Sequence, residues 1–491
     1  MNTKSRKLYS ATQIRELDSA AMEGGIAGHI LMQRAGHASW LTLQRFRPNA
    51  KRIDVLCGSG NNGGDGYEIA RLANAVGRNV RVWQVGPAPT TGDALTARAS
   101  WLKAGGTVQS LQSDSLLGAE VIVDALLGIG VKRELTGDVA TAVTTINQAR
   151  EHGAWVLAID VPSGLDAGTG RVYGTAVRAN MTITFIGNKV GLYTGAGVDC
   201  AGEIVLDTLN IPPQTYDATE SLATLQDGSD LVTWLPKRAR NSHKGTHGHV
   251  LVIGGDSGMS GAALLAGQAA LRSGAGLVSL ATRGSHALVL TPAQPELMCR
   301  RVENVDELTP LMNQASVIAI GPGLGQEAWG RALFARALLS QLPLVVDADA
   351  LNLLASTSFK RENWVLTPHP GEAARMLGVT TEEIQNDRPA AVEALKARYG
   401  GTVVLKGAGT LIQGHRLSLC PYGNPGMAVA GMGDVLTGMI AAFIAQGQAL
   451  GQAANTGVLA HALAGDRAAV QGMRGLLPTD LLSELRTVVN P

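Results

Sequence analysis

The chain alternates short apolar runs with amphipathic stretches, and most of the apolar runs end in glycine or in polar residues. Short runs rich in Val, Ile and Leu are typical of strands that are buried on both faces of a parallel sheet. In the first half they predict strands at 52–57, 79–85, 120–124, 155–160 and 181–186. Parallel strands need crossovers between them, so helices are expected to alternate with these strands.

Helical spacing marks the segment that precedes the first predicted strand. It predicts two helices within residues 10–46, with apolar faces formed by Ile14, Leu17, Ala21, Ile30, Leu31, Ala35, Ala38 and Leu41. A further helix is expected to begin near Tyr67, after the glycine-rich segment 58–66.

A second alternation begins at His249 and predicts strands at 249–254, 276–282, 316–320, 343–346, 364–366 and 402–405. Between the two alternations, residues 210–244 form a polar stretch with a proline pair and a short basic cluster, which we interpret as a linker. A chain of 491 residues is too long for one ordinary domain. We therefore predict an α/β protein of two three-layer α/β/α domains, residues 1–216 and 217–491, with a Rossmann-like parallel sheet in the first.

Composition excludes several classes of protein. Lys and Arg total 41 and Asp and Glu total 40, so the net charge of +1 favours neither a nucleic-acid partner nor a membrane surface. The four cysteines lie far apart without a CxxC pair, which argues against a zinc site or a disulfide framework and favours a reducing compartment. Lys4, Arg6 and Lys7 precede no apolar segment, and no apolar run approaches the ~20 residues of a membrane span. We expect a cytoplasmic protein, and the small residues of 262–270 would allow close subunit packing in a homo-oligomer.

Polar residues gather after the predicted strands of the first half. The glycine-rich segment carries Asn61, Asn62 and Asp65, whose side chains can ligate a cation or hold a ribose. Asp124 and Asp160 end the third and fourth strands, and each alone is equally well explained as the cap of a helix or turn. Because the carboxyl ends of parallel strands share one edge, we expect these residues to form one site.

In the second half, the stretch 424–438 is a glycine-rich turn that runs directly into an apolar helix. Gly431 and Gly433 allow close backbone approach, and the unpaired N–H groups at the start of the helix favour an anion such as a phosphate. A carboxylate among such amides is best explained as a base acting on a hydroxyl that meets the phosphate, which makes Asp434 a candidate base. The alternative is that Asp434 only caps the helix. A second glycine turn at 406–410 adds a lysine, as a bound nucleotide requires.

These motifs resemble two known families. The second half resembles the ribokinase-like, ADP- or ATP-dependent NAD(P)H-hydrate dehydratases in Gly254-Gly-Asp256, Gly321-Pro-Gly-Leu-Gly325, Thr367-Pro-His-Pro-Gly-Glu372, Lys406-Gly-Ala-Gly-Thr410 and 423–438. The first half is similar to the NAD(P)H-hydrate epimerases in Gly60-Asn-Asn-Gly-Gly-Asp-Gly66, Asp124, 128–134 and 160–166. The match covers nearly the whole chain in one order, so it implies the bifunctional nicotinamide-nucleotide repair family, with a ribokinase-like second domain.

The resemblance implies roles for individual residues. In the first domain it implies a catalytic Asp160, the potassium ligands Asn62, Asp124 and Ser163, and a substrate cradle of Asn61, Asn62, Gly63, Gly64, Asp65, Gly128, Ile129, Gly130, Val131, Lys132, Arg133 and Glu134. In the second domain it implies a catalytic Asp434, substrate contacts from Gly323, His369 and Asp434, and a nucleotide site formed by Lys406, Gly407, Ala408, Gly409, Thr410 and Gly433. The implied co-substrate is ADP, and magnesium is expected with its phosphates.

The implied chemistry is the repair of NADH or NADPH that has taken up water and carries a hydroxyl at C6 in the R or S configuration. The second domain would dehydrate the S form, using ADP and releasing AMP and phosphate, while the first would interconvert the two forms. A small-molecule kinase fused to a nucleotide-binding domain is the main alternative, and it would accumulate a phosphorylated product. Lys189, after the fifth predicted strand, would either neutralise a phosphate or be solvated.

Overall fold

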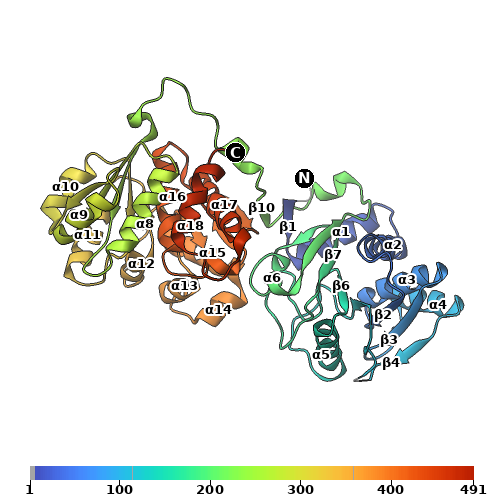
Figure 1. Ribbon diagram of the computed structural model, residues 1–491. Coiled ribbons are helices and arrows are strands. Elements are labelled where there is room, and N and C mark those ends of the chain that lie inside the picture. Colours follow the sequence, from blue (N-terminus) through green and yellow to red (C-terminus); the bar gives the residue numbers. More distant parts are fainter. Residues whose placement is uncertain (1–5, 113, 358) are drawn as a thin grey trace. The chain divides into compact units, whose positions relative to one another are not determined.

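The computed structural model describes residues 6–112, 114–357 and 359–491. Of the residues named above, Lys4 lies outside these ranges. The chain forms two compact units that divide between Thr224 and Leu225, later than the predicted boundary at Tyr216 (Figure 1). Tyr216 belongs with the first unit because its ring is buried and its hydroxyl donates to the carbonyl of Ile186 at 2.7 Å.

The first unit is built on a parallel sheet of seven strands in the order β4-β3-β2-β5-β6-β7-β9. The strands are β2 (Arg52–Cys57), β3 (Asn79–Gln84), β4 (Val108–Ser110), β5 (Val121–Ala125), β6 (Trp155–Ile159), β7 (Met181–Phe185) and β9 (Glu203–Asp207). The main helices are α1 (Ala11–Glu23), α2 (Gly28–Phe46), α3 (Asn61–Ala75), α4 (Gly92–Lys103) and α5 (Gly137–Glu151). A small pairing beside the sheet joins β1 (Lys7–Tyr9) to β8 (Asn188–Lys189) and β10 (Ala223–Leu225).

Helices cover both faces of this sheet. Val55 and Cys57 of β2 belong to the apolar cluster under α2, α3 and α4, whereas Leu56 between them belongs to the cluster under α5. Alternate residues of one strand point to opposite faces, so the unit has three layers, as the sequence predicts. The prediction that Leu41 belongs to the apolar face of its helix is wrong, because its side chain is 50% exposed.

The second unit contains nine strands in the order β13-β12-β11-β14-β15-β16-β17-β18-β19, parallel up to β17 and antiparallel beyond it. They are β11 (His249–Ile253), β12 (Leu277–Thr282), β13 (Met298–Arg301), β14 (Val317–Ile320), β15 (Leu344–Val346), β16 (Trp364–Leu366), β17 (Thr402–Leu405), β18 (Thr410–Gln413) and β19 (Leu417–Cys420). The helices used below are α8 (Ser260–Arg272), α11 (Ala328–Leu338), α12 (Ala348–Ala355), α13 (Pro370–Leu377), α14 (Thr381–Asn386), α15 (Arg388–Tyr399), α16 (Met432–Ala445), α17 (Leu450–Ala468) and α18 (Pro478–Val488).

Val250 and Val252 of β11 pack in the cluster under α8, α16 and α17, and the alternate residues Leu251 and Ile253 are equally buried on the other face. This unit therefore also has a sheet covered on both sides. Helices α8 and α16 approach so closely that a Cβ at Gly438 would lie 2.0 Å from the carbonyl oxygen of Ala266. The small residues of α8 are thus explained by packing inside the unit, without a second subunit.

The interpretation of residues 210–244 as a linker without elements is wrong. This stretch contains η3 (Pro213–Tyr216), β10 and α7 (Asp230–Trp234), and it ends at the first residue of η4 (Lys244–His247). The basic cluster is partly engaged, because the Arg238 guanidinium donates to Gln446 and to the carbonyl of Gly274. Among the described residues, none of the helices combines the length and the apolar character that a membrane crossing requires.

Candidate active sites

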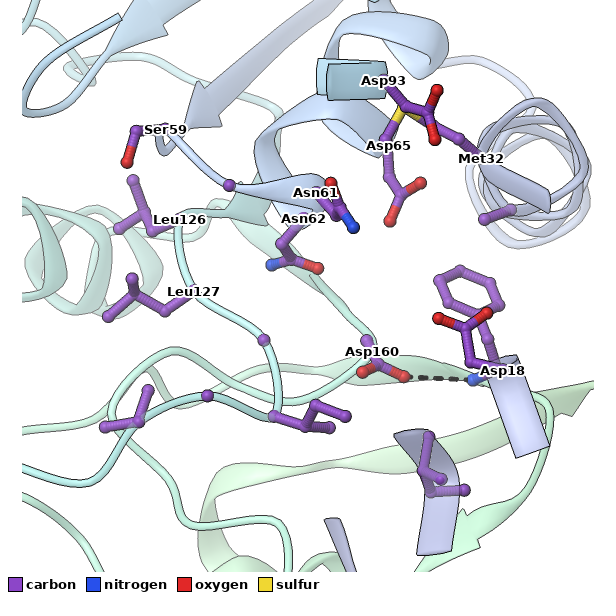
Figure 2. A pocket seen from close by; sticks show the side chains of 18 of the residues that line it. Asp18, Met32, Ser59, Asn61, Asn62, Asp65, Asp93, Leu126, Leu127 and Asp160 are labelled. Atoms are coloured by element: carbon purple, nitrogen blue, oxygen red, sulfur yellow. Dashed lines mark hydrogen bonds between the residues drawn. The ribbon is translucent and has the colours of Figure 1, made fainter. Parts of the chain in front are cut away.

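The first unit encloses a cavity of about 660 Å³ beside the carboxyl ends of β2, β5, β6 and β7 (Figure 2). Of the predicted site residues, its lining includes Asn61, Asn62, Asp65, Asp160 and the loop Gly128, Ile129, Gly130, Val131, Lys132, Arg133 and Glu134. The cavity also receives Asp18 from α1 and Asp93 from α4, which the sequence patterns did not single out. Gly63 and Gly64 do not line it.

Gly63 and Gly64 serve the packing of α3. The helix begins at Asn61 rather than near Tyr67, so most of the predicted glycine loop is its first turns. A Cβ at Gly63 would lie 2.1 Å from the carbonyl oxygen of Gly58, and one at Gly64 would lie 2.6 Å from the sulfur of Met32. Glycine lets the start of α3 pack directly on the preceding turn and on α2. This packing directs the amides at the start of α3 toward the cavity.

Asp160 occupies an unusual backbone position at the end of β6. Its φ of +67° lies in the left-handed region, which a non-glycine residue adopts only when its surroundings impose it. The amide of Asp160 donates to the carbonyl of Ile183 at 2.7 Å, which ties this conformation to the neighbouring strand. The backbone therefore leaves the strand at Asp160, and the carboxylate of this residue turns toward the cavity.

Lys189 holds that carboxylate in place. Its Nζ lies 2.5 Å from Asp160 Oδ1 and also donates to the Thr184 hydroxyl at 2.8 Å and the Phe185 carbonyl at 2.9 Å. The side chain is 0% exposed, so both sequence-based alternatives, a phosphate contact and a solvated lysine, are wrong. Burial lowers the pKa of Lys189, and the charge of Asp160 opposes that effect.

The predicted potassium ligands converge on one short segment. The amide of Ser163 donates to Asp124 Oδ2 at 2.8 Å and its hydroxyl donates to Oδ1 at 2.6 Å, while the amide of Leu127 donates to the Ser163 hydroxyl. Burial raises the pKa of Asp124 to about 6, although the three hydrogen bonds from Ser163 and Leu126 counteract it. A Cβ at Gly128 would lie 3.7 Å from Asn62 Oδ1, so Asn62 faces the same segment, and its buried amide nitrogen has no partner in the described part of the chain.

These donors fit a monovalent cation. They are hard carboxylate, hydroxyl and amide oxygens, and a fully buried carboxylate that pairs with no described lysine or arginine is costly unless a cation compensates it. No cluster of three or more His, Cys, Asp or Glu side chains suited to a metal occurs among residues 6–112, 114–357 and 359–491.

In the second unit, Lys406 pairs with a buried carboxylate that the sequence analysis did not assign. Lys406 Nζ lies 2.7 Å from Asp347 Oδ1 and 3.8 Å from Glu372 Oε2, and the Thr437 hydroxyl of α16 donates to Asp347 Oδ2 at 2.7 Å. Burial alone would raise the pKa of Asp347, but Lys406 and the hydroxyl donors outweigh it and lower the pKa. Asp347 thereby fixes the lysine against the start of α16, where a Cβ at Gly433 would lie 3.2 Å from Nζ.

Asp434 does not cap α16. The N-cap of the helix is Gly431, with φ +96°, and no side chain caps it. Burial, followed by the charge of Asp347, raises the pKa of Asp434 to about 7. Asp349 and Glu372 contribute in the same direction, and Lys406 opposes them. A carboxyl that titrates near neutral pH and has no hydrogen-bond partner among the described residues suits a general base.

The predicted nucleotide turn 406–410 lies between β17 and β18. Gly407 and Gly409 adopt φ of +129° and +64°, and the Thr410 hydroxyl closes the turn by donating to the carbonyl of Gly407 at 2.9 Å. Beneath it, the buried Arg388 guanidinium donates to the carbonyls of Leu405 and Lys406, each at 3.2 Å. These carbonyls face inward, and Ala408 lies at the tip of the turn.

The substrate-side residues lie on two neighbouring loops. Gly323 has φ +59°, and its carbonyl accepts a hydrogen bond from the amide of Asp256 at 2.7 Å. The ring nitrogen Nδ1 of His369 accepts from the amide of Gly371 at 2.9 Å, which leaves Nε2 as the protonated nitrogen of the neutral ring. The imidazole is 54% exposed and caps α13, and its Nε2 lies 3.5 Å from Glu372 Oε1.

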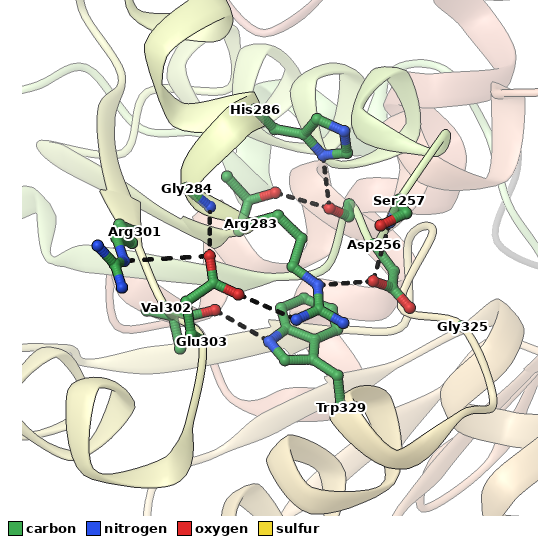
Figure 3. Close-up of polar contacts among 12 residues, drawn as sticks. Asp256, Ser257, Arg283, Gly284, His286, Arg301, Val302, Glu303, Gly325 and Trp329 are labelled. Atoms are coloured by element: carbon green, nitrogen blue, oxygen red, sulfur yellow. Dashed lines mark hydrogen bonds and ion pairs between the residues drawn. The ribbon is translucent and has the colours of Figure 1, made fainter.

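An arginine network holds the Gly323 loop (Figure 3). The Arg283 guanidinium donates to Asp256 at 2.8 Å and to Glu303 at 3.0 Å, and it lies 4.5 Å from the ring centroid of Trp329. Because Asp256 also binds the backbone of Gly323, this network links the ends of β11, β12 and β13 to the start of α11. Sequence patterns give no sign of it, since its members lie far apart along the chain.

Comparison with known proteins covers both units. Residues 250–487 match the family described as NAD(P)H-hydrate dehydratase, and residues 28–191 match the family described as YjeF-related protein N-terminus. The bifunctional NAD(P)H-hydrate repair enzyme Nnr of Coxiella burnetii is 47% identical over 488 residues, covering 99% of both chains. That of Escherichia coli is 43% identical over 471 residues, covering 95% of this chain and 90% of the other.

Among the solved structures that resemble this chain is one that matches little more than half of it. It is the ADP/ATP-dependent NAD(P)H-hydrate dehydratase of Bacillus subtilis, co-crystallised with ATP and Mg²⁺, which is 32% identical and has a TM-score of 0.50. The match covers 54% of this chain and 96% of that protein. The likeness agrees with the predicted ribokinase-like fold of the second domain. Because the similarity to the two bifunctional enzymes extends over nearly the full length and includes both matched domains, the chain belongs to the family of bifunctional NAD(P)H-hydrate repair enzymes.

Proposed function

We propose how the two units divide the repair that this family performs. As a member of the family, the protein is an NAD(P)H-hydrate epimerase and an NAD(P)H-hydrate dehydratase. We assign the interconversion of the R and S hydrates to the cavity beside Asp160, and the dehydration of the S hydrate to the site around Asp434. The observation that supports the second assignment best is a partner-free carboxyl with a pKa of about 7 at the start of a helix.

In the dehydratase site, the carboxylate of Asp434 takes the proton of the C6 hydroxyl, and the hydroxyl oxygen attacks the terminal phosphoryl group of ADP, so that AMP leaves. The free amides at the start of α16 and the charge of Lys406 stabilise the negative charge that develops on the phosphoryl oxygens. The ring nitrogen N1 then expels phosphate from C6, and loss of a proton from C5 restores the dihydronicotinamide. Asp347 acts through Lys406 and is a positioning residue.

The choice of ADP over ATP is part of the proposal. The Bacillus relative is described as ADP/ATP-dependent, so the nucleotide class is supported while the donor for this chain is inferred from the bifunctional family. Magnesium would be held mainly by phosphate oxygens, since the described residues offer no carboxylate cluster for it. Potassium would be held in the first unit by Asn62, Asp124 and Ser163, where it would neutralise the buried carboxylate and shape the loop at 126–128.

The test is recovery of near-ultraviolet absorbance from a mixture of both NADH hydrates with magnesium, potassium and either ADP or ATP. Wild-type protein should recover all of the coenzyme with ADP, Asp160→Asn only the S fraction at a comparable rate, and Asp434→Asn none. Asp138→Asn is the matched control for Asp160→Asn, and Glu382→Gln is the matched control for Asp434→Asn. Each removes an exposed carboxylate from the same unit as the variant that it controls. Accumulation of a stable phosphorylated hydrate would instead favour the kinase alternative.

We further propose a cytoplasmic location, whereas the homo-oligomeric assembly stays a prediction from the sequence, because the small residues of α8 pack inside the unit. The free state of Cys57, Cys200, Cys299 and Cys420 supports a reducing compartment. Cell fractionation tests the location, and sedimentation velocity tests the assembly, for which a monomer at micromolar concentration is the contrary outcome.

A further inference from the structure

The cavity of the first unit is strongly acidic for a site that binds an anionic dinucleotide. Asp18, Asp65, Asp93 and Asp160 all line it, and Lys189 neutralises only the last of these. Cationic lining residues are confined to the loop 128–134, where the exposed Lys132 and Arg133 precede Glu134 and form no ion pair with any described residue. This division of charge suits a pyrophosphate at the loop and a group that becomes positively charged among the carboxyls.

The carboxyls differ in their surroundings. Asp160 is paired with Lys189, whereas Asp65 and Asp18 have no hydrogen-bond or ion-pair partner in the described part of the chain. Asp65 is only 9% exposed, and Figure 2 shows its carboxyl pointing from α3 into the space that Asp18 and Asp160 border from the facing side. The site thus sets an unpaired buried carboxyl opposite one that is paired with a lysine.

Burial, followed by the charges of Asp160, Asp18 and Glu68, raises the pKa of Asp65 well above its usual range. The protonated form of Asp65 is thereby favoured, while the Lys189 ammonium lies against Asp160 as its counter-ion. Two carboxyls whose surroundings differ in this way are the usual arrangement for an acid and a base in one site.

The C6 hydroxyl of the hydrate sits beside the ring nitrogen N1, so two routes of epimerisation are chemically possible. In one, the C6–O bond breaks, N1 supplies its electron pair to give a cationic iminium, and water adds to the other face. In the other, the C6–N1 bond breaks, and the ring closes again after rotation, with the original oxygen retained. Only the first route places positive charge inside the ring, where facing carboxylates stabilise it.

We propose that Asp65 is the general acid of the epimerase site, protonating the C6 hydroxyl so that it leaves as water, and that Asp18 and Asp160 stabilise the iminium from the facing side. When water adds to the opposite face of C6, Asp160 accepts its proton, and exchange with solvent returns the proton to Asp65. The C6–O bond breaks and forms once in each event, no electrons are gained or lost, and no co-reactant is required. This inference rests on the assignment of the epimerase to this cavity.

The test uses the full-length protein with one pure hydrate epimer in ¹⁸O-labelled water, without nucleotide so that the dehydratase is silent. Mass spectrometry of the two separated epimers reports the oxygen, and a sample without protein gives the spontaneous background. The wild-type protein should place one solvent oxygen in every molecule of the newly formed epimer. Retention of the original oxygen would establish ring opening and overturn the proposal, whatever any variant does.

Asp65→Asn keeps the shape of the side chain but cannot supply the proton, so epimerisation and oxygen exchange should fall together by about 10² to 10⁴. Asp138→Asn, on the exposed start of α5, is the matched control and should equal the wild type. ADP-dependent dehydration of the S epimer by each variant verifies that the chain is folded and active. If Asp65→Asn epimerises at the wild-type rate while Asp160→Asn does not, Asp65 is not the acid and the cavity assignment stands; if neither variant is impaired, the cavity assignment itself fails.

Discussion

Replacement of Asp434 by asparagine is expected to abolish dehydration and, above neutral pH, to stabilise the second unit. The carboxylate is held in an unfavourable environment, since burial and the charge of Asp347 raise its pKa to about 7. Catalysis needs the charged form, and folding does not. An amide of the same shape removes the base and the repulsion together.

The magnitude follows from the two pKa values. The usual pKa of an aspartate is 3.8, and Asp434 in the folded protein titrates at about 7. Between these values the native state binds more protons than the unfolded chain, so the free energy of unfolding falls as the pH rises and is lowest above pH 7. At about 1.4 kcal/mol for each unit between the pKa values, the loss reaches about 4 kcal/mol as an upper value. For a unit of this size, that corresponds to a rise in Tm of at most roughly 10 °C in Asp434→Asn.

Calorimetry at pH 5 and pH 8.5 separates this electrostatic effect from any other effect of the amide. At pH 5 the carboxyl is protonated in the folded protein but ionised in the unfolded chain, so about 1.6 kcal/mol of the loss is already present and Asp434→Asn should have a Tm higher by roughly 4 °C. At pH 8.5 the difference in Tm should be at least twice as large, and Glu382→Gln should match the wild type at both values. The transition that moves on addition of ADP identifies the second unit. An equal difference in Tm at the two pH values would refute the electrostatic argument, and a fully active variant would refute the assignment of the base.

Three further outcomes follow from the contacts described. Lys189→Met leaves Asp160 as a partly buried charge without its counter-ion, and it should destabilise the first unit by about 3–5 kcal/mol in urea denaturation and abolish epimerisation. Gly63→Ala should lower the Tm of the first unit and slow epimerisation, because its Cβ would overlap a backbone carbonyl at 2.1 Å, while Gly60→Ala, with nothing within 4 Å of its Cβ, should leave the Tm nearly unchanged. Lys406→Met should cost about 10² to 10³ in the rate of ADP-dependent dehydration and leave oxygen exchange by the epimerase site unaffected.

Most strands, and their alternation with helices, could be predicted because strands of a buried parallel sheet are recognisable in the sequence as apolar runs. The strands that were missed are short or lie at the sheet edges, and they bury little. Val108–Ser110 has two exposed residues of three, and Glu203–Asp207 contains no fully buried residue, so neither carries an apolar pattern. The start of α3 was missed for a different reason. Glycine normally weakens a helix, yet here Gly63 and Gly64 are required by packing against the preceding turn and α2.

Some site residues could likewise be predicted from the sequence, and others could not. Asp434 could be singled out from sequence because its chemistry is local, a carboxylate in a glycine turn before a helix. The partner that shapes it could not, since Asp347 lies far from Lys406 along the chain and meets it only when β15 and β17 enter the same sheet. Lys189 shows the same limit: its sequence position is compatible with a solvated lysine, and only the fold turns it inward onto Asp160.

Both units thus place a buried lysine–aspartate pair at the carboxyl edge of a parallel sheet, and in each the charge of the aspartate raises the pKa of a neighbouring carboxyl. Buried ion pairs contribute little net stability, because desolvation offsets their attraction, so their value lies in the charge state that they impose on a neighbour. In the first unit, Lys189 is the counter-ion of Asp160, and the charge of Asp160 adds to burial in raising the pKa of Asp65. In the second, Lys406 lowers the pKa of Asp347, and the charge of Asp347 adds to burial in raising the pKa of Asp434 to about 7. One site is therefore prepared to give a proton to the C6 hydroxyl and the other to take a proton from it. The same oxygen can then leave as water in the epimerase site or attack a phosphoryl group in the dehydratase site.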